Sequence, residues 1–319
     1  MSTPVRWLVV GAGQAGQCHM AAIAKTPAAV LAGVVDPAAA PGIAGPVFRD
    51  LGDGIAKTKP DAVIIAAPND LHRALARQAI DAGLPVLCEK PVGRTVTDAE
   101  DICAYAEARG VPAGVVLNQR THASSRWVHD QIASGRIAAR SVSFAGAVPR
   151  LGRWHIETAR SGGGALRTIA IHALDLMLWW LGEPTEISAQ LGGGVAEDVV
   201  SVTGRFKHGR IGVVNISAVA DIGAGPVRCV IDDEHTRVVM DGHRVIDHRG
   251  LPPPPAAEAH DPALKYGPGH LNLIADATAG FASGRGFLIP LTDALPTLRL
   301  IERLYVSSGR ITGDRTTGR

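Results

Sequence analysis

The first 117 residues alternate short apolar runs with longer amphipathic stretches, and this alternation restricts the possible folds more than any other feature of the chain. Short apolar runs are typical of buried strands, and the stretches between them have helical periodicity. A strand, a helix and a second strand in this order form a crossover unit, so the pattern predicts a doubly wound parallel sheet. The expected strands are 5–10, 30–35, 62–67, 86–88 and 115–117, and the expected helices are 14–25, 70–82 and 97–109.

From about residue 120 the pattern changes to alternating apolar and polar residues, which is typical of strands with one buried face. Such strands favour an antiparallel sheet, and helical stretches accompany them. The expected fold class is therefore α/β, with a parallel sheet followed by a mostly antiparallel one. The expected strands are 141–148, 199–206, 211–219, 228–231 and 237–240, and the expected helices are 124–134, 164–181, 270–283 and 293–307.

A length of 319 residues suits two domains, and the change of pattern places their boundary between residues 119 and 120. The proline run at 251–255 cannot lie inside a helix or a central strand, so it predicts a surface connection.

Composition excludes several classes of protein. Lys and Arg number 32 against 30 Asp and Glu, without a block of like charges, so a nucleic-acid partner is not expected. The apolar run before Gly11 is shorter than a secretion leader, and no run reaches the length of a membrane span. The four cysteines lack a CxxC spacing, which favours reduced thiols over a disulfide framework or a zinc site. We therefore expect a cytoplasmic protein without a metal.

The segment Gly11-Ala12-Gly13-Gln14-Ala15-Gly16 follows the first expected strand and opens the first expected helix. Gly11 permits a tight turn, Gly13 lets a pyrophosphate approach the backbone, and Gly16 lets helix and strand pack closely. The free N–H groups at the helix start, including those near Gln14 and Ala15, would face the phosphates. A merely flexible turn is the alternative, but the strand–turn–helix context favours a dinucleotide site.

Asp36 stands twenty residues after Gly16, at the end of the second expected strand. There a carboxylate would accept hydrogen bonds from the adenosine ribose and repel a 2′-phosphate, which favours NAD over NADP without excluding NADP. The alternative is a strand-end Asp that caps the turn before Pro37.

Two further polar segments follow expected strands, at 66–72 and 88–91. Ligands of open parallel sheets bind at the edge where the strands end. Lys90 lies there and is one of only six lysines. Shielded beside a nicotinamide, it would have a lowered pKa and could stabilise an alkoxide, although a solvent-facing lysine is an equal alternative.

A third group follows three glycines at 162–164. In one continuous helix, Thr168, His172, Asp175 and Trp179 would share a face beside an apolar stripe. A single helical histidine is usually structural, but the polar face and the glycine-rich approach favour a site for His172.

These residues resemble the glucose–fructose oxidoreductase and inositol dehydrogenase family, Gfo/Idh/MocA, over nearly the whole chain. Each motif is weak alone, but together they occur in the family's order. They are the fingerprint with His19, Pro68-Asn69-x-x-His72, Glu89-Lys90-Pro91, Asn118-x-Arg120, the triple glycine with His172 and Asp175, and Gly269-His270.

The resemblance implies a Rossmann domain at 1–119 that binds NAD(P), and a C-terminal α/β domain at 120–319 with a large open sheet for substrate binding and oligomerisation. It implies a homodimer or homotetramer through that sheet, a carbohydrate-like substrate between the domains, and often a cis Lys–Pro bond. Its activity is hydride transfer between nicotinamide and the carbon of a secondary alcohol.

Carried over residue by residue, the resemblance makes Lys90 bind the reacting oxygen and His172 act as general base or acid. Asn118 and Arg120 would line the substrate pocket, where Thr168, His172, Trp154 and His155 are also expected. The expected cofactor contacts are Gly11, Gly13, Gln14, Ala15, Gly16, Asp36, Pro68, Asn69, His72, Glu89, Lys90 and Asn118.

The chain departs from the family pattern at Thr168, where Asp is common four residues before the histidine, and at Ala170, where Gly is common. Threonine cannot act as a carboxylate base, so His172 with Lys90 is the expected pair. Trp154 is a pocket wall or a core residue. The nearby Arg150, Arg153, Arg160 and Arg167 form a carboxylate site or a solvated face.

The leading hypothesis is an NAD(P)-dependent oxidoreductase acting on a sugar, polyol or sugar-derived acid. The alternatives are a glycoside hydrolase assisted by tightly held NAD and a non-catalytic sensor of the cofactor. Motifs of serine hydrolases, P-loop proteins and zinc proteases are absent from the sequence.

Overall fold

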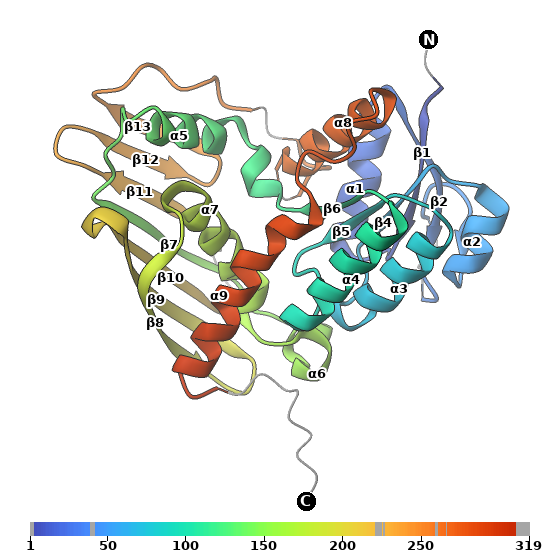
Figure 1. The fold of residues 1–319 in the computed structure, drawn as a ribbon, viewed down its shortest axis with the longest axis horizontal. Coiled ribbons are helices and arrows are strands. Elements are labelled where there is room, and N and C mark those ends of the chain that lie inside the picture. The colour runs from blue at the N-terminus through green and yellow to red at the C-terminus, as the bar shows by residue number, and fades with distance from the viewer. Residues whose placement is uncertain are drawn as a thin grey trace, which may run out of the picture. The chain divides into compact units, whose positions relative to one another are not determined.

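The computed structural model describes residues 3–38, 42–220, 225, 227–258, 261–265 and 267–310. It divides into two compact units (Figure 1). Unit 1 comprises residues 1–118 and 259–295, and unit 2 comprises residues 119–258 and 296–319. The first junction lies between residues 118 and 119, one residue before the boundary expected from the sequence, and residues 259–295 group with the N-terminal unit. The cause is long-range packing: Val115 N–H donates to Ile289 O at 3.1 Å, which ties this segment to the parallel sheet.

Unit 1 is built on a six-stranded sheet in the order β3-β2-β1-β4-β5-β6, with every neighbouring pair parallel. This confirms the doubly wound sheet predicted from the alternation of apolar runs. Trp7 to Val10 of the central strand are buried, as an apolar run between two helical layers requires. The strands are β1 (Val5–Val10), β2 (Ala29–Val35), β3 (Val47–Phe48), β4 (Ala62–Ile65), β5 (Val86–Glu89) and β6 (Ala113–Val116).

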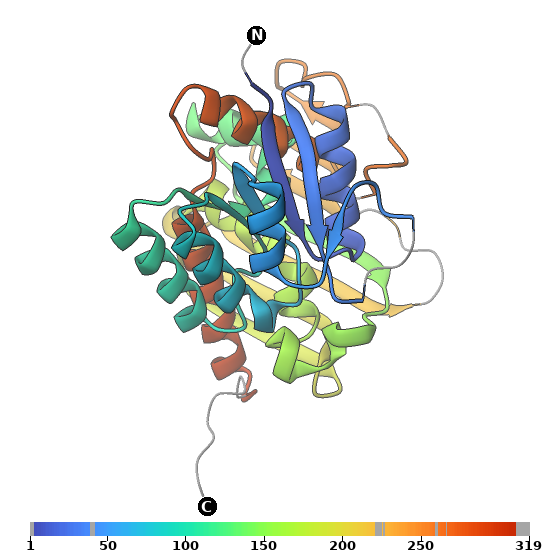
Figure 2. The same cartoon turned by 90° about the vertical axis from the view of Figure 1, so that its right-hand side faces the viewer.

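Helices cover both faces of this sheet. Figure 2 shows α1 on one side of β1 and β2, and α3 and α4 on the other side. Helix α1 packs against α8, which comes from the returning segment. Thr95 and Asp98 form a capping box at the start of α4, and Gly110 ends that helix in the left-handed conformation. The helices of unit 1 are α1 (Gln14–Lys25), α2 (Leu51–Thr58), α3 (Asn69–Asp81), α4 (Val96–Arg109) and α8 (Gly269–Ala282).

Unit 2 is built on a seven-stranded sheet in the order β13-β12-β11-β7-β10-β9-β8. Only the β7–β10 pair is parallel among these strands, so the mostly antiparallel sheet is confirmed. Strands β8 and β13 were not expected, because neither has a clean alternation of apolar residues. The strands are β7 (Ser141–Pro149), β8 (Pro184–Gly193), β9 (Glu197–Phe206), β10 (Ile211–Ala220), β11 (Arg228–Asp232), β12 (Arg237–Asp241) and β13 (Arg244–Arg249).

The helical segments of unit 2 include α5 and α7, which pack together, and α7 also contacts β10 (Figure 1). The single helix expected at 164–181 is instead a π-helix, η3 (Leu166–Ala170), followed by α7 (Ile171–Leu181). The remaining helical segments of unit 2 are α5 (Ala123–Ala133), η2 (Arg153–Ile156), α6 (Thr158–Ser161) and η4 (Lys207–Gly209). Two segments begin in unit 1 and continue into unit 2, η1 (Asn118–Thr121) and α9 (Ala294–Ser307), and η5 (Leu291–Asp293) lies in unit 1.

None of the helices in the described ranges is long and apolar enough to cross a membrane. Cys18, Cys88, Cys103 and Cys229 are free thiols, as their spacing predicts.

Candidate functional site

The fingerprint forms the turn between β1 and α1, and its three glycines have three different surroundings. Gly11 has φ +101°, and a Cβ there would clash with Ala66 O. A Cβ at Gly16 would clash with Gly11 O, so helix and strand approach too closely for any side chain. A Cβ at Gly13 would meet nothing within 4 Å. The open space in front of Gly13, at the N-terminus of α1, therefore fits the pyrophosphate of a dinucleotide.

Asp36 is held against this turn. Its Oδ2 accepts a hydrogen bond from Ala12 N at 2.7 Å, and its Oδ1 accepts one from Ala38 N at 2.8 Å. A carboxylate oxygen can accept two hydrogen bonds, so both oxygens keep capacity for ribose hydroxyls. Asp36 thus caps the strand end and stands beside the fingerprint, and the two interpretations of the sequence are compatible.

The segment after β4 holds three of the expected contact residues, Pro68, Asn69 and His72. Pro68 precedes α3, and Asn69 is its first residue and is buried. His72 is fully buried, with Nε2 at 2.8 Å from Ala67 O and Nδ1 at 3.0 Å from Pro91 O. Burial lowers the pKa of His72 and thereby favours its neutral form. The structure places His72 as a link between the two strand-end loops.

Lys90 directly follows β5, and the Lys90–Pro91 bond is cis, as the resemblance implies. Burial lowers the pKa of the Lys90 amine, and the neighbouring Glu89 carboxylate opposes this by raising it. The net result is a lysine that gives up its proton more readily than a solvent-exposed one.

Glu89 lies in a buried cluster with two histidines of unit 1. Its Oε1 is 2.9 Å from His19 Nε2 on α1 and 3.3 Å from His270 Nε2 on α8. The nitrogen and oxygen atoms of the three side chains lie within 4.8 Å of one another. One carboxylate oxygen facing both rings at hydrogen-bond distance is the geometry of a hydrogen-bonded cluster. His19 Nδ1 is buried without a hydrogen-bond partner, whereas a metal-ligating histidine normally donates its other N–H.

Sequence reasoning named His19 and His270 within the motifs and Glu89 as a cofactor contact, but it did not bring the three together. Their sequence separation leaves no periodic signal, since they come from a helix, a strand end and the returning segment.

Asn118 and Arg120 both lie in η1, which follows β6, but they have different surroundings. Asn118 is buried, and its backbone lies so close to Gly269 that a Cβ there would stand 2.6 Å from Asn118 O. The guanidinium of Arg120 donates two hydrogen bonds to Asp175, at 2.8 and 2.7 Å. Its charge is therefore neutralised inside unit 2, although the sequence predicts that it contacts substrate.

His172 and Thr168 do not lie on one regular helix. His172 lies in the first turn of α7 and is half-buried. Thr168 lies in the π-helix and donates its hydroxyl to Gly164 O at 2.8 Å. The extra residue per turn of a π-helix changes the register that the sequence reading assumed, and π-turns are frequent at functional sites.

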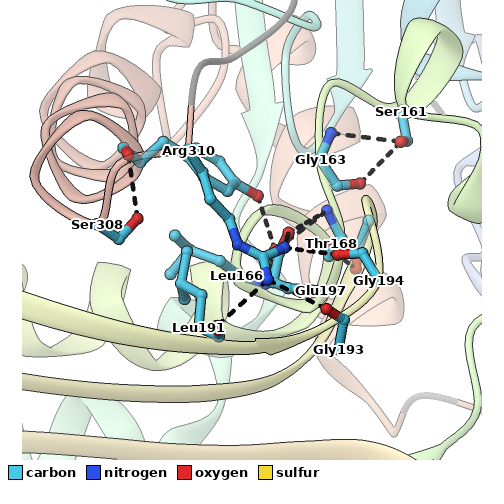
Figure 3. A network of polar contacts seen from close by, with 12 residues as sticks. Ser161, Gly163, Leu166, Thr168, Leu191, Gly193, Gly194, Glu197, Ser308 and Arg310 are labelled. Atoms are coloured by element: carbon cyan, nitrogen blue, oxygen red, sulfur yellow. Dashed lines mark hydrogen bonds and ion pairs between the residues drawn. The ribbon is translucent and has the colours of Figure 1, made fainter.

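Glu197, which sequence reasoning missed, supports the backbone that leads to His172. It is 1% exposed, and its carboxylate accepts the N–H groups of Gly164 and Leu166 and the hydroxyl of Tyr305. Figure 3 shows this network, in which Arg310 also bonds the carbonyls of Leu191, Gly193 and Gly194. A glutamate at the start of a strand gives no sequence signal for such a role.

Trp154 and His155 stack on each other with ring centroids 3.9 Å apart, and both are half-buried. Three of the nearby arginines have described contacts, and each contact is to a different group. Arg150 donates to Val219 O, Arg160 lies 3.8 Å from Glu157, and Arg167 is fully buried with Glu302 at 3.9 Å. The side chain of Arg153 lies outside the described part of the structure.

Known proteins resemble the chain in both units. Residues 5–117 match the profile of an oxidoreductase family with an NAD-binding Rossmann fold, GFO_IDH_MocA, and residues 126–245 match the GFO/IDH/MocA C-terminal domain.

Two curated relatives are a 1,5-anhydro-D-fructose reductase from Ensifer adhaerens and an inositol 2-dehydrogenase from Rhizobium meliloti. The reductase is 37% identical over 161 residues, 47% of this chain and 48% of that protein. The dehydrogenase is 29% identical over 237 residues, 69% of this chain and 70% of that protein. The chain spans about half the length of the reductase and of other curated relatives that it matches.

Among solved structures, the WlbA dehydrogenase from Bordetella pertussis, in complex with NADH and UDP-GlcNAcA, superposes with a TM-score of 0.84 at 24% identity. The match covers 97% of this chain and 96% of that one, and at this identity it shows the fold. Sequence profiles, fingerprint geometry and fold agree: the chain belongs to the GFO/IDH/MocA oxidoreductase family, with that family's NAD-binding Rossmann domain followed by its C-terminal domain.

Proposed function

We propose that this protein is an NAD-dependent dehydrogenase or reductase that acts on a secondary alcohol or ketone of a sugar, polyol or sugar-derived acid. The observation that carries the proposal is Lys90, a partly buried lysine at the end of β5 with a lowered pKa. Strand β5, which Lys90 follows, lies next to β4 in the parallel sheet. The fingerprint of the same unit has open space at Gly13 for a dinucleotide.

In this proposal Lys90 binds the reacting oxygen and stabilises the negative charge that develops there. His172 takes the hydroxyl proton during oxidation and returns it during reduction. Bound nicotinamide supplies the hydride acceptor or donor. Thr168 supports this two-residue assignment, because a hydroxyl that donates to Gly164 O cannot replace a carboxylate base.

The cofactor contacts assigned to the chain are the fingerprint, Asp36, and the strand-end residues Pro68, Asn69, Glu89, Lys90 and Asn118. We assign NAD in preference to NADP, because Asp36 already lies against the fingerprint turn and would repel a 2′-phosphate. Solved neighbours of the same fold were crystallised with NADH or NAD, which supports this choice.

The substrate class rests on the relatives, which act on an anhydro sugar and on inositol by their names. Neutral sugars and polyols suit the chain better than acids, because the guanidinium of Arg120 is already paired with Asp175. We assign Trp154 and His155 to the substrate on the strength of the resemblance. Association of two or four copies through the seven-stranded sheet belongs to the same proposal.

The test is NADH formation by the purified protein with NAD and then NADP, across a panel of aldoses, polyols, inositols and sugar acids. Mass spectrometry of the same preparation detects any nucleotide that is already bound. Turnover of a panel member with NAD supports the proposal. Tightly bound NAD without net NADH formation would contradict it, and would favour an NAD-assisted hydrolase or a cofactor sensor.

A further inference from the structure

The buried cluster of His19, Glu89 and His270 lies directly behind Lys90. While Glu89 Oε1 faces the two imidazoles, Oε2 accepts a hydrogen bond from the backbone N–H of Lys90 at 3.2 Å. Both carboxylate oxygens are thus engaged, and three separate elements hold them: α1, β5 and α8. The side chain of Glu89 has little freedom to move relative to the backbone that carries Lys90.

The charge of this cluster follows from its contacts. Burial works to raise the pKa of Glu89, but hydrogen bonds from His19 and His270 outweigh it and hold that pKa well below its usual range. Burial lowers the pKa of His19, so its ring donates as a neutral imidazole. The Glu89 carboxylate therefore remains ionised inside the protein.

Burial favours the neutral form of two other ionisable groups beside this strand end, Cys88 and His72. Burial raises the pKa of the Cys88 thiol on β5 well above its usual value, and burial lowers the pKa of His72 on α3. Burial lowers the pKa of Lys90, and the Glu89 carboxylate opposes this by raising it.

We propose that His19 and His270 fix Glu89 as a positioning residue, a permanent negative charge beside Lys90 that determines the charge state in which this lysine meets its substrate. The inference rests on the catalytic role proposed for Lys90. The two histidines act only through Glu89: each donates one hydrogen bond that keeps the carboxylate ionised and in place. Removing the charge, or both donors, should take away an influence that raises the pKa of Lys90, so the amine should be neutral more often.

The experiment measures the charge state of Lys90 without any substrate. Trace acetylation of the folded protein over a range of pH, followed by peptide mass spectrometry, reports the reactivity of each lysine, and only the neutral amine reacts. The chain has six lysines, so exposed Lys207 serves as an internal reference. In Glu89→Gln, Lys90 should react roughly tenfold faster than in the wild type at neutral pH, relative to Lys207.

A matched control is Asp101→Asn, which removes another hydrogen-bonded carboxylate of unit 1 and should leave Lys90 unchanged. His270→Gln keeps a donor and should behave like the wild type, whereas the double variant His19→Phe, His270→Phe should raise Lys90 reactivity as Glu89→Gln does. Circular dichroism and thermal unfolding identify any variant that has lost its fold. If Glu89→Gln does not fold, the histidine variants carry the test.

Unchanged Lys90 reactivity in folded Glu89→Gln, or in the folded histidine double variant, would overturn the inference. So would a stoichiometric metal in the purified wild type, because the carboxylate would then be a ligand and not a free charge. A silent substrate panel would count against the proposed function and would leave this labelling result intact.

Discussion

The carboxylate of Asp175 accepts two hydrogen bonds from the guanidinium of Arg120, and the hydroxyl of Thr297 adds a third at 3.1 Å. Asp175 is 1% exposed and the side chain of Arg120 is 13% exposed, so this bidentate pair is largely shielded from water. Trp179, one turn further along α7, lies under the same guanidinium, with its ring centroid 5.7 Å away. The polar face of α7 thus stabilises unit 2 at Asp175.

Asp175→Ala should destabilise the protein by about 3 kcal/mol, because it leaves a shielded guanidinium without its partner. Chemical unfolding of both proteins measures the difference. Thr297→Val, which removes only the third hydrogen bond, should cost about 1 kcal/mol. Equal stability of Asp175→Ala and the wild type would show that the ion pair contributes nothing.

Gly13→Ala should impair NADH binding, whereas Gly16→Ala should impair stability. A Cβ at Gly13 meets open space, so Gly13→Ala should fold normally and bind NADH at least tenfold more weakly, because the methyl group occupies the position of the pyrophosphate. A Cβ at Gly16 clashes with Gly11 O, so Gly16→Ala should lower the melting temperature by several degrees. Calorimetry and NADH fluorescence separate the two. Normal NADH affinity of Gly13→Ala would remove the fingerprint from the cofactor site.

Asp36→Ala should weaken NAD binding and relax the discrimination against NADP, because it removes the charge that would repel a 2′-phosphate. It also removes the acceptor of Ala12 N–H, so the fingerprint turn should loosen. Dissociation constants for NADH and NADPH give the preference as a ratio, which is independent of a general loss of affinity. An unaltered ratio would contradict the assignment of Asp36.

Lys90→Met and His172→Gln should each lower kcat by 100-fold or more, as expected for loss of a charge-stabilising group or of a general base. His172→Gln should bind NADH within a few-fold of the wild type, since His172 is not among the assigned cofactor contacts, and Lys90→Met should keep the contacts of the fingerprint with the pyrophosphate. Steady-state kinetics on the substrate found in the panel, with NADH titration alongside, tests this. Wild-type turnover by both variants would disprove the assignment.

Asp101 makes stability depend on pH at the acid end. Hydrogen bonds from Arg73, and then from Arg77, lower its pKa to about 2. In the unfolded chain the pKa of an aspartate is about 3.9. Since the folded pKa is the lower one, the stabilisation is present above about pH 4 and is lost as the pH falls toward about 2. Asp101→Asn should therefore be less stable than the wild type at pH 6, with the difference disappearing near pH 2 in thermal unfolding.

Local sequence determined the elements and the order in which they follow. The apolar runs of residues 7–10 and 62–65 are buried on both faces, and this leaves a parallel sheet with helical crossovers as the consistent solution. The fingerprint was recognisable for the same reason, because a tight turn and a close helix require glycine at fixed positions. Lys90 was a candidate site residue because it follows an expected strand, and His172 was one because it lies on the polar face of an expected helix.

Tertiary structure decided which distant residues meet. Nothing in residues 259–295 indicates that they pack against α1 and β6, since that depends on apolar faces separated by more than 140 residues. The pairing of Arg120 with Asp175, the support of Gly164 by Glu197, and the cluster of His19, Glu89 and His270 are of the same kind. Periodicity and turn chemistry act over a few residues, whereas a hydrogen bond between buried side chains depends on the packing of the whole unit.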